Sequence, residues 1–491
     1  MLAAVFAALA VVALAGCVGP DQRAVSMRTP APDALAHTLA SAEAAGPDNA
    51  AWPTAHWVDV FADPQLTALV DEACANSPDL DVAHARMAAA QAQLDAFGSV
   101  TGLAGTATAS VMKARAPQVD GVANVNVAGT NFPIELFSEP WASPSSVIGA
   151  ARYDLDLWGH NRAIGRALLS ERAAAAVDAQ QARLALVSAL VTLYSQFDYA
   201  FARRDLLEHK VRDAQRRHAI SGERARRGLD NGYDAEATRA ADAALQAQLQ
   251  QADDAITQLR LQMGVLAGSG PERGLALGRP KMAEPAGATL PPTLPLDLLG
   301  RRPDIVAARL RADAAGGRID AARAQFYPNI NLLAVTGFSS LNVNTLFSRS
   351  SITLAAGPAL SLPLFERPRL QAQLRAEEAS ADTMVALYNK TLDEALGEVA
   401  RSVLALNSAE GLARHQAQVL AARERMAQIA DERHRRGLLT RAEQLAAQAA
   451  LLDEQLRLAA LQAQRRDAWI ALMRALGGGF DINVNGRNTH A

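Results

Sequence analysis

The hexapeptide Arg-x-Arg-Arg-Gly-Leu occurs twice in the chain, at 224–229 and at 433–438. Each copy interrupts a very long segment in which apolar residues recur at helical spacing, so each marks a point where a helix reverses. A repeated unit constrains the architecture more than any single residue does, because both copies must fold alike. We therefore predict a first repeat at 63–285, a second repeat at 286–480 and a short tail at 481–491.

The composition of the hexapeptide explains why a helix should end there. Arginines in the last helical turn complement the helix dipole, and each contributes about 0.3–1 kcal/mol. Gly228 and Gly437 stand where a left-handed residue is favoured, and Leu229 and Leu438 can make the apolar contact of a Schellman ending. The predicted tips lie near 228–231 and 437–440.

Helix start signals follow both endings at once. Thr440 and Glu443 form a capping box, and Asn231 or Asp230 can cap the corresponding helix of the first repeat. Loops this short allow only antiparallel neighbours. Each repeat therefore contains an outgoing helix, a tight turn and a returning helix.

The outgoing helices are unusually long. The first runs from 161 to 227 without proline, and the cognate run covers 368–436. At 1.5 Å per residue each is roughly 100 Å long, more than three times the hydrocarbon thickness of a membrane. The returning helices at 234–266 and 440–476, and the leading helices that begin at Pro78 and Pro303, are shorter. One returning and one leading helix stacked end to end therefore match a long one.

Both long helices carry apolar seams of the coiled-coil type. Abundant alanine elsewhere lets helices approach one another closely. The seam residues are Val187, Leu190, Tyr194, Phe197 and Phe201 in the first helix, and Val385, Tyr388, Leu392, Leu396, Val399, Val403 and Leu406 in the second.

Each leading helix is followed by two stretches with the alternating pattern of strands. Residues 147–157 place apolar side chains on one face, and Arg152, Asp154 and Asp156 on the other. About 10 residues suffice for a tilted strand to cross a bilayer. Hairpins of a soluble protein are the alternative interpretation. The candidate strands are 101–112, whose alternation is the weakest, 147–157, 330–338, where it is less clean, and 352–362.

Aromatic residues adjoin these stretches and favour the membrane interpretation. Such residues form girdles where strands leave the hydrocarbon. After the N-terminus no segment looks long and apolar enough for a transmembrane helix, so we expect strands to cross the membrane. The adjoining aromatic residues are Phe97, Trp141, Trp158, Phe326, Tyr327 and Phe365.

The N-terminal segment predicts export and lipidation. The apolar run at 1–16 is short for a membrane span and typical of a cleaved signal peptide. It ends in Leu-Ala-Gly before Cys17, which resembles the bacterial lipoprotein box, although no Lys or Arg precedes the run. By that resemblance Cys17 carries diacylglycerol and an N-linked acyl chain such as palmitate, and it begins a lipidated leader at 17–62. Val18 is not the aspartate of inner-membrane lipoproteins, so the destination is the outer membrane.

Four strands cannot stand alone in lipid, because an open sheet leaves edge N–H and C=O groups unpaired. Closure must come from other copies of the chain. Two copies would form a narrow eight-stranded barrel filled by side chains, whereas three would form twelve strands around a lumen. The periodicity of the strands is compatible with two copies and with three.

Four motifs follow one another between residues 153 and 365, within a likeness that covers nearly the whole mature chain. They are Tyr-Asp-Leu-Asp-Leu-Trp-Gly at 153–159, Leu-Leu-Gly-Arg-Arg-Pro-Asp-Ile at 298–305, Ala-Gln-Phe-Tyr-Pro-Asn-Ile at 324–330 and Leu-Pro-Leu-Phe at 362–365. In this order they resemble the TolC/OprM family of outer-membrane efflux proteins. The lipoprotein box makes the chain more similar to the OprM and NodT branch than to unlipidated TolC.

The resemblance implies a mainly α protein with a small membrane β part. Three copies form a twelve-stranded β-barrel that continues into a long periplasmic α-helical barrel. The homotrimer docks on a periplasmic adaptor and an inner-membrane pump, commonly of the resistance-nodulation-division type, and drugs or other small molecules pass outward through it. In the family the helix reversals form the adaptor-docking tip, which here corresponds to Arg227, Gly228, Leu229, Arg436, Gly437 and Leu438.

The resemblance also indicates where the pore narrows. Family members place aspartates on the helix just before the tip, and Asp431 and Arg433 occupy that stretch. A ring of three carboxylates would favour cations and could latch onto arginines of neighbouring helices. A solvated surface aspartate is the alternative interpretation. The first repeat has Gly222 at the equivalent place, so a single ring is expected.

Other classes of protein find little support in the residues. No metalloprotease, nucleophile-elbow or phosphate-loop motif occurs, so we expect no enzyme, no metal and no cofactor beyond the lipid. The formal net charge of −3 offers no footprint for nucleic acid. A structural coiled-coil lipoprotein and an exit duct for type I protein secretion remain alternatives. A periplasmic adaptor is a further alternative, but it would need a single helical hairpin flanked by soluble β domains. Two hairpins interleaved with strand pairs argue against it.

Overall fold

The computed structural model describes residues 25–31, 33–37, 52–115, 123–127, 130–134, 141–285 and 294–481. Cys17 and much of the predicted leader lie outside these residues. The chain forms two compact units. The strand unit comprises 1–25, 89–172 and 311–384, and the helical unit comprises 26–88, 173–310 and 385–491.

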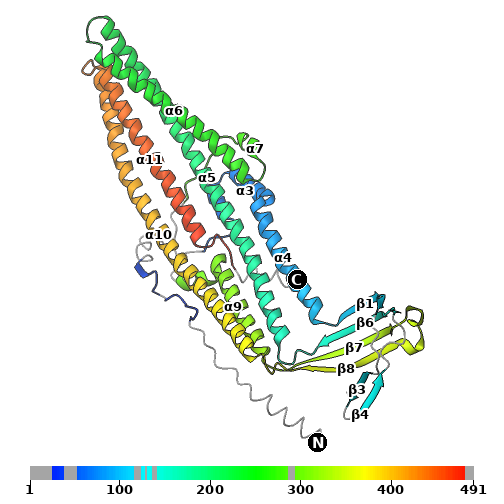
Figure 1. Ribbon diagram of the computed structural model, residues 1–491. Coiled ribbons are helices and arrows are strands. Elements are labelled where there is room, and N and C mark those ends of the chain that lie inside the picture. Colours follow the sequence, from blue (N-terminus) through cyan, green and yellow to red (C-terminus); the bar gives the residue numbers. More distant parts are fainter. Residues whose placement is uncertain are drawn as a thin grey trace. The chain divides into compact units, whose positions relative to one another are not determined.

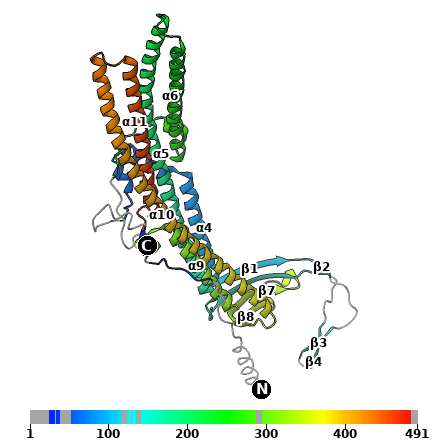
Figure 2. The ribbon, with the colours of Figure 1, turned by 90° about the vertical axis from the view of Figure 1, so that its left-hand side faces the viewer.

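Helices follow the same order in both halves of the chain (Figure 1). The long outgoing helices are confirmed, with 67 residues in α5 and 69 in α10. Figure 2 shows each beside its returning partner, α5 with α6 and α10 with α11. The first half contains η2 (Trp57–Phe61), α3 (Pro64–Asn76), α4 (Pro78–Thr101), α5 (His160–Arg226), α6 (Tyr233–Leu266) and α7 (Pro271–Leu275). The second half contains α8 (Leu294–Arg301), α9 (Pro303–Ala324), η3 (Val343–Thr345), η4 (Arg349–Ser351), α10 (Arg367–Arg435) and α11 (Arg441–Ala475).

Side-chain caps explain where two of these helices begin. The Asp63 carboxylate accepts a hydrogen bond from the Gln65 N–H at 2.9 Å, and proline occupies the first turn of α3. The predicted capping box of Thr440 and Glu443 is present at the start of α11. Both caps satisfy N–H groups that a helix leaves free at its first turn.

Four antiparallel strands form the main sheet in the order β1-β6-β7-β8. They are β1 (Ala104–Val111), β6 (Ser145–Asp154), β7 (Asn329–Ser340) and β8 (Ile352–Ser361), and all four had been predicted from the alternation. Between β1 and β6 the described residues form four further strands in two pairs, and these strands had not been predicted from the sequence. β2 (Ala114–Arg115) pairs with β5 (Trp141–Ala142), and β3 (Ala123–Val127) pairs with β4 (Thr130–Ile134).

Strand β6 ends at Asp154 instead of 157, because the following residues prepare the start of α5. Asp156 has a left-handed backbone with φ 45°. Its carboxylate accepts hydrogen bonds from the N–H groups of Asn161 and Arg162 at 2.9 and 3.0 Å. Asp156 is therefore a helix cap, whereas the alternation had assigned it to the polar face of a strand.

The core of the helical unit contains the predicted seams of the two long helices. α5 contributes Leu190, Tyr194 and Phe197, and α10 contributes Leu392 and Val399, all nearly or completely buried. These helices hold their positions through apolar packing more than through helix propensity. Phe201 and Leu396 pack against the same core while remaining partly exposed.

Helix α5 corrects one expectation drawn from the sequence. It contains an 18-residue stretch that passes the test of length and apolar composition for a membrane span, and it alone does so among the described residues. Buried packing is the physical reason, since 56% of that stretch is buried and the helix supplies the core. The expectation that no helix would pass this test was wrong.

Two glycines let each returning helix end against the start of the leading helix of its own repeat. Gly268 follows α6 with φ 73°, and a Cβ there would lie 2.1 Å from the carbonyl oxygen of Asn76. Gly477 follows α11 with φ 89°, and a Cβ there would lie 1.9 Å from the carbonyl oxygen of Arg301. The end-to-end stacking predicted from helix lengths is thus present in both repeats.

Gly268→Ala and Gly477→Ala should each destabilise the protein by about 1–3 kcal/mol, because each places a methyl group against a carbonyl oxygen at a positive φ. Thermal unfolding of the purified full-length chain in detergent measures the loss as a lower midpoint. Gly411→Ala in α10 is the control, since nothing lies within 4 Å of its added Cβ. Equal midpoints for all three variants would contradict the close approach.

Candidate functional site

The pairing register sorts the main sheet into two faces. Residues directly opposite each other in antiparallel strands project to the same side. Tyr153 pairs with Leu332, which pairs with Pro358, so alternate residues of β6, β7 and β8 share one face. The apolar face contains Val111, Val147, Tyr153, Ile330, Leu332, Phe338, Ile352, Leu354 and Leu360. The polar face contains Thr106, Thr108, Ser110, Arg152, Asp154, Asn329, Asn331, Thr353 and Ser361.

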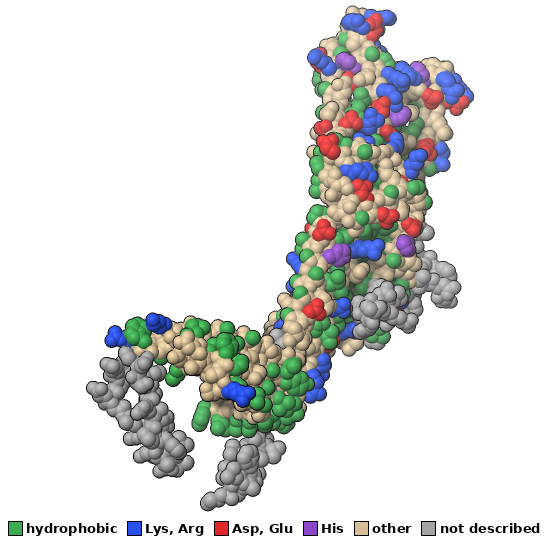
Figure 3. Space-filling view, turned by 90° about the vertical axis from the view of Figure 1, so that its right-hand side faces the viewer, with side chains coloured by type: hydrophobic (Ala, Val, Ile, Leu, Met, Phe, Trp, Pro, Cys, Tyr) green, Lys and Arg blue, Asp and Glu red, His purple; other side chains and the backbone are tan. Residues whose placement is uncertain are grey.

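The apolar face is exposed at the surface of the chain. Leu332 is 45% exposed and Leu354 is 78% exposed, and Figure 3 shows hydrophobic side chains gathered over the strands. Arg152 and Asp154, the charged residues of the four strands, both lie on the polar face. This is the arrangement of a membrane barrel with lipid outside and a polar lumen. The two-faced prediction is confirmed, including β7, where the alternation was less clean.

Aromatic side chains lie at both ends of the sheet. Where β6 leads into α5, Trp158 stacks on Tyr327 with ring centroids 4.8 Å apart. The Trp158 Nε1–H donates to the carbonyl of Pro328 at 2.8 Å, and nearby Phe365 is 94% exposed. Trp141, at the other end, is 53% exposed. Exposed aromatics at both ends of an apolar face are typical of the two interfaces of a membrane.

Two aromatic residues assigned to this girdle belong to helix packing instead. Phe326 packs against the buried Ile319 and Leu374 of the strand unit. The Phe97 ring faces α5, where it would lie 3.5 Å from a Cβ added at Gly165. Proximity to a strand in the sequence was not enough to assign them, because both side chains leave helix ends on the side of a neighbouring helix.

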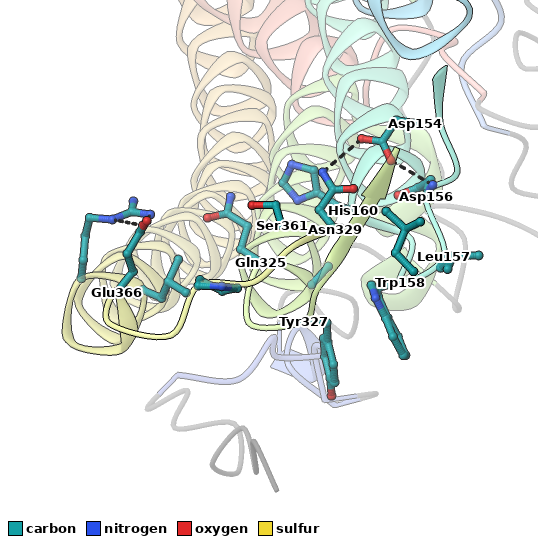
Figure 4. A pocket seen from close by; sticks show the side chains of 15 residues that line it. Asp154, Asp156, Leu157, Trp158, His160, Gln325, Tyr327, Asn329, Ser361 and Glu366 are labelled. Atoms are coloured by element: carbon teal, nitrogen blue, oxygen red, sulfur yellow. Dashed lines mark hydrogen bonds and ion pairs between the residues drawn. The ribbon is translucent and has the colours of Figure 1, made fainter. Parts of the chain in front are cut away.

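A cavity of about 290 Å³ lies at the ends of β6, β7 and β8 (Figure 4). Its wall includes Asp154, Asn329 and Ser361 of the polar face, together with His160 and Gln325. The Asn329 Nδ2 donates to Asp154 Oδ2 at 3.4 Å. The cavity therefore extends the polar face toward the helices.

Both hexapeptides end their helices with the same hydrogen bonds. The Leu229 N–H donates to the Arg224 carbonyl, and the Leu438 N–H donates to the Arg433 carbonyl, each at 2.9 Å. These bonds, across the left-handed glycine, form the Schellman ending that the sequence predicted. The left-handed residues are Gly228 (φ 67°) and Gly437 (φ 73°).

The tip leucines differ from the expectation in one respect. Leu229 is 65% exposed and Leu438 is 68% exposed, so neither is buried by the apolar contact that usually accompanies this ending. Glycine adopts the left-handed conformation of the turn without strain, so the turn forms without the apolar contact. Each tip therefore presents a leucine to its surroundings, beside the exposed arginines of the hexapeptide.

Asn231 and Asp230, the two predicted caps in the turn of the first repeat, make different interactions. The Asn231 Oδ1 accepts from the Tyr233 N–H at 3.0 Å, although Gly232 occupies the N-cap position of α6. Asp230 lies 3.3 Å from Arg224 in an ion pair. Asn231 thus serves the new helix, and Asp230 neutralises the last turn of the old one.

Asp431 is half-exposed in the last turns of α10. Its carboxylate accepts a hydrogen bond from Gln444 of α11 and lies 3.8 Å from Arg435. Arg433 is exposed and forms no ion pair with another described residue. At Gly222, the equivalent place in the first repeat, a Cβ would meet open space. The fold therefore brings Asp431 to Gln444 and Arg435, and does not bring it to Arg433.

A buried arginine joins three helices where the second repeat begins. Arg302 donates to Asp304 at 2.6 Å, to Glu398 at 2.9 Å and to the Ala475 carbonyl at 2.8 Å. Burial alone would raise the pKa of Glu398, but the hydrogen bond from Arg474 and the charge of Arg302 outweigh it, so this pKa is lowered. The ionised cluster fixes the junction of α9, α10 and α11.

A second buried arginine holds the segment that precedes the second repeat. Arg466 of α11 lies 3.0 Å from Asp198 of α5 and 2.7 Å from Glu284. Burial raises the pKa of Asp198, and the charge of Arg466 opposes that rise. Sequence reasoning missed both clusters, because their members lie far apart in the chain and no motif spaces them.

Two helical repeats joined to a sheet with one apolar and one polar surface are the arrangement expected of a protomer of a membrane channel. The chain belongs to the outer membrane efflux protein family, whose model matches residues 69–269 and 294–478. It is therefore an outer-membrane channel of small-molecule efflux systems, with its helical part in the periplasm.

Individual relatives agree over most of the chain. The putative multidrug resistance outer membrane protein MdtQ of Shigella flexneri is 28% identical over 469 residues, which cover 95% of this chain and 96% of the relative. The fusaric acid resistance protein FusA of Burkholderia cepacia is 34% identical over 388 residues, covering 76% and 69%. The crystal structure of VceC from Vibrio cholerae superposes with a TM-score of 0.76 at 30% identity, covering 88% of this chain and all of VceC.

The assignment of the two faces can be tested with neighbouring leucines of β7. Leu332→Arg on the apolar face should destabilise the inserted protein by up to about 2–4 kcal/mol, the cost of arginine facing lipid at mid-bilayer depth. Leu333→Arg, on the polar face and similarly exposed, is the matched control and should be tolerated. The amount of heat-modifiable protein in outer-membrane fractions measures both. Equal losses would refute the assignment.

Proposed function

We propose that three copies of the chain form the exit duct of a tripartite efflux system. In this homotrimer twelve strands close a β-barrel, and the long helices continue it as an α-helical barrel in the periplasm. A periplasmic adaptor docks at the helix tips and connects the duct to an inner-membrane pump, for which we propose the resistance-nodulation-division type. Small molecules pass outward without chemistry on the channel.

The main sheet carries this proposal. Within the described residues its edge strands β1 and β8 each have a neighbour on one side only. Unpaired edge groups are costly in lipid. Joining β8 of one copy to β1 of the next satisfies both edges and keeps the apolar face outward. Two copies would give eight strands filled by side chains, and three give a lumen. Export requires a lumen, so we propose three copies of the chain.

The cargo we propose is small organic molecules. MdtQ and FusA are named for resistance to multiple drugs and to fusaric acid. The polar face offers hydroxyl and amide groups with one arginine and one aspartate, Arg152 and Asp154. Such a mixed lining excludes few polar molecules by charge, which suits a duct whose pump selects the cargo.

We assign adaptor docking to the two tips. Each presents an exposed leucine at its turn and arginines in the turn before it. An adaptor surface with an apolar pocket and carboxylates would complement both features. The docking residues are Arg227, Gly228 and Leu229 in the first repeat, and Arg436, Gly437 and Leu438 in the second.

We also propose that Cys17 carries diacylglycerol and an N-linked acyl chain. The lipoprotein box at 14–17 supports this assignment. Several acyl chains give stable anchoring where a single chain would give only reversible binding. The leader would then be held at the same membrane that the strands cross.

Two alternatives differ in specific ways. A type I secretion duct would use the same barrel and tips, with another pump and a polypeptide cargo. A structural coiled-coil lipoprotein has no use for a sheet with a lipid-facing surface, so the apolar face argues against it. The partner recovered at the tips distinguishes all three.

Asp431 is our candidate for the pore constriction, together with Arg433. Asp431→Ala should raise single-channel conductance and leakiness to large antibiotics, because it removes a carboxylate and the hydrogen bond that holds Gln444 of the returning helix. Planar-bilayer recording measures the conductance. Glu432→Ala removes the adjacent carboxylate, which pairs with Arg436 within α10 at 2.9 Å, and should change little. Unchanged conductance in Asp431→Ala would exclude it from the constriction.

A cysteine at the second tip should capture the adaptor. With Cys74→Ala to remove the other thiol downstream of Cys17, Leu438→Cys should crosslink in vivo to a periplasmic adaptor identified by mass spectrometry. Leu275→Cys is the control, because Leu275 is also exposed but lies in α7, outside both tips. A secretion-type partner would favour the first alternative. No partner at the tip beyond the control level would contradict the docking assignment.

A further inference from the structure

The cavity at the ends of β6, β7 and β8 lies entirely within the strand unit, and one part of its wall is polar. Figure 4 shows the polar side chains gathered around a common space, whereas Trp158 and Tyr327 point away from them. The polar side chains are Asp154, His160, Gln325, Asn329 and Ser361. The chemistry of the cavity therefore depends on the charge and the hydrogen-bonding atoms of this polar part.

Three carboxylates line the cavity, and arginines neutralise two of them. Asp156 lies 3.3 Å from Arg162, and Glu366 forms an ion pair with Arg369. The third carboxylate, that of Asp154, makes no ion pair with any described residue. The lining therefore has an excess of one negative charge, located at Asp154.

Neutral donors hold the Asp154 carboxylate in place. Its Oδ1 accepts a hydrogen bond from the Asp156 N–H at 3.1 Å, and its Oδ2 accepts one from Asn329 Nδ2 at 3.4 Å. Arg152 shares the polar face, but it does not line the cavity and it forms no ion pair with a described residue. The charge of Asp154 is thus fixed in position without being neutralised.

Further hydrogen-bond acceptors lie close to this carboxylate. The His160 Nδ1 is 2.9 Å from the Ala321 carbonyl oxygen, which can only accept, so Nδ1 carries a proton and Nε2 of the neutral ring is an acceptor. Asn331 lies directly across from Asp154 in the pairing of β6 with β7, and its Oδ1 is buried without a hydrogen-bond partner among the described residues. Acceptors beside an unpaired carboxylate favour a ligand that is positively charged and rich in donors.

The chemistry of the lining selects an organic cation over a metal ion. Among the described residues no group of three His, Cys, Asp or Glu side chains is arranged to hold a metal. An ammonium group has three N–H donors and a guanidinium group has five, and both form charge-assisted hydrogen bonds with carboxylates. The volume of about 290 Å³ is at the lower end of the range for sites that bind small molecules.

We propose that this cavity binds the ammonium or guanidinium group of a small organic cation, with Asp154 as its counterion. His160 Nε2 and the side-chain oxygens of Asn329 and Ser361 supply further acceptors for its N–H groups. The inference rests on the proposed function, because only in the duct does the polar face meet the cargo. Binding itself requires the cavity of one chain, so it is measured separately from pore formation.

Fluorescence anisotropy of dansylcadaverine, a primary amine, tests the site in the purified full-length chain in non-ionic detergent. Its N-acetyl derivative has the same fluorophore without the charge, and the wild type should bind the amine about tenfold more tightly than this derivative. Asp154→Asn should lose the preference, because it removes the charge and keeps an acceptor for the Asp156 N–H, and Asp154→Glu should keep part of it. Asp320→Asn is the matched control and should bind as the wild type does, since Asp320 is a carboxylate of the same unit outside the cavity.

Three results would overturn the cation site. They are equal binding of the amine and its derivative by the wild type, an unchanged preference in Asp154→Asn, and an equal loss of preference in Asp320→Asn. Planar-bilayer recording of the wild type separates this proposal from that of the duct. A pore without any preference for the amine would overturn the site alone, whereas a preference in a chain that forms no pore would support the site and contradict the duct.

Discussion

The backbone of a sheet in lipid must have every N–H and C=O group paired, and the rest of this structure depends on that constraint. The described part of the chain contributes four strands to its main sheet, which has two open edges, and one face of this sheet is apolar and exposed. In the duct that we propose, lipid covers this face and further copies of the chain pair the edges, so insertion and assembly would be parts of one process.

In the helical unit, a small number of contacts hold very long helices in place. Buried Leu190, Tyr194 and Val399 fix the middle of the long helices, while Gly268 and Gly477 fix the points where returning helices meet leading ones. Buried Arg302 adds a charged junction, in which it donates hydrogen bonds to Asp304 and Glu398. Packing, close backbone approach and ion pairing thus act at different levels of one repeat.

Local sequence predicted most of the elements because their causes are local. The left-handed Gly228 and Gly437, the Thr440 capping box and the alternation of β6 and β8 each depend on residues a few positions apart. The same reasoning missed what depends on space. It placed Phe326 in the girdle when it packs against Ile319, and it gave no sign of the cluster around Arg466.

The sequence by itself determined the two repeats, the lengths and endings of their long helices, and the strands that alternate between lipid and lumen. Periodicity and helix caps encode these features directly. Only the tertiary structure decided which strand faces share a surface, which carboxylates surround the buried Arg302 and Arg466, and which carboxylate accepts a hydrogen bond from the returning helix at the second tip. Those outcomes depend on strand register and helix contacts between residues far apart in the chain, and no local pattern records them.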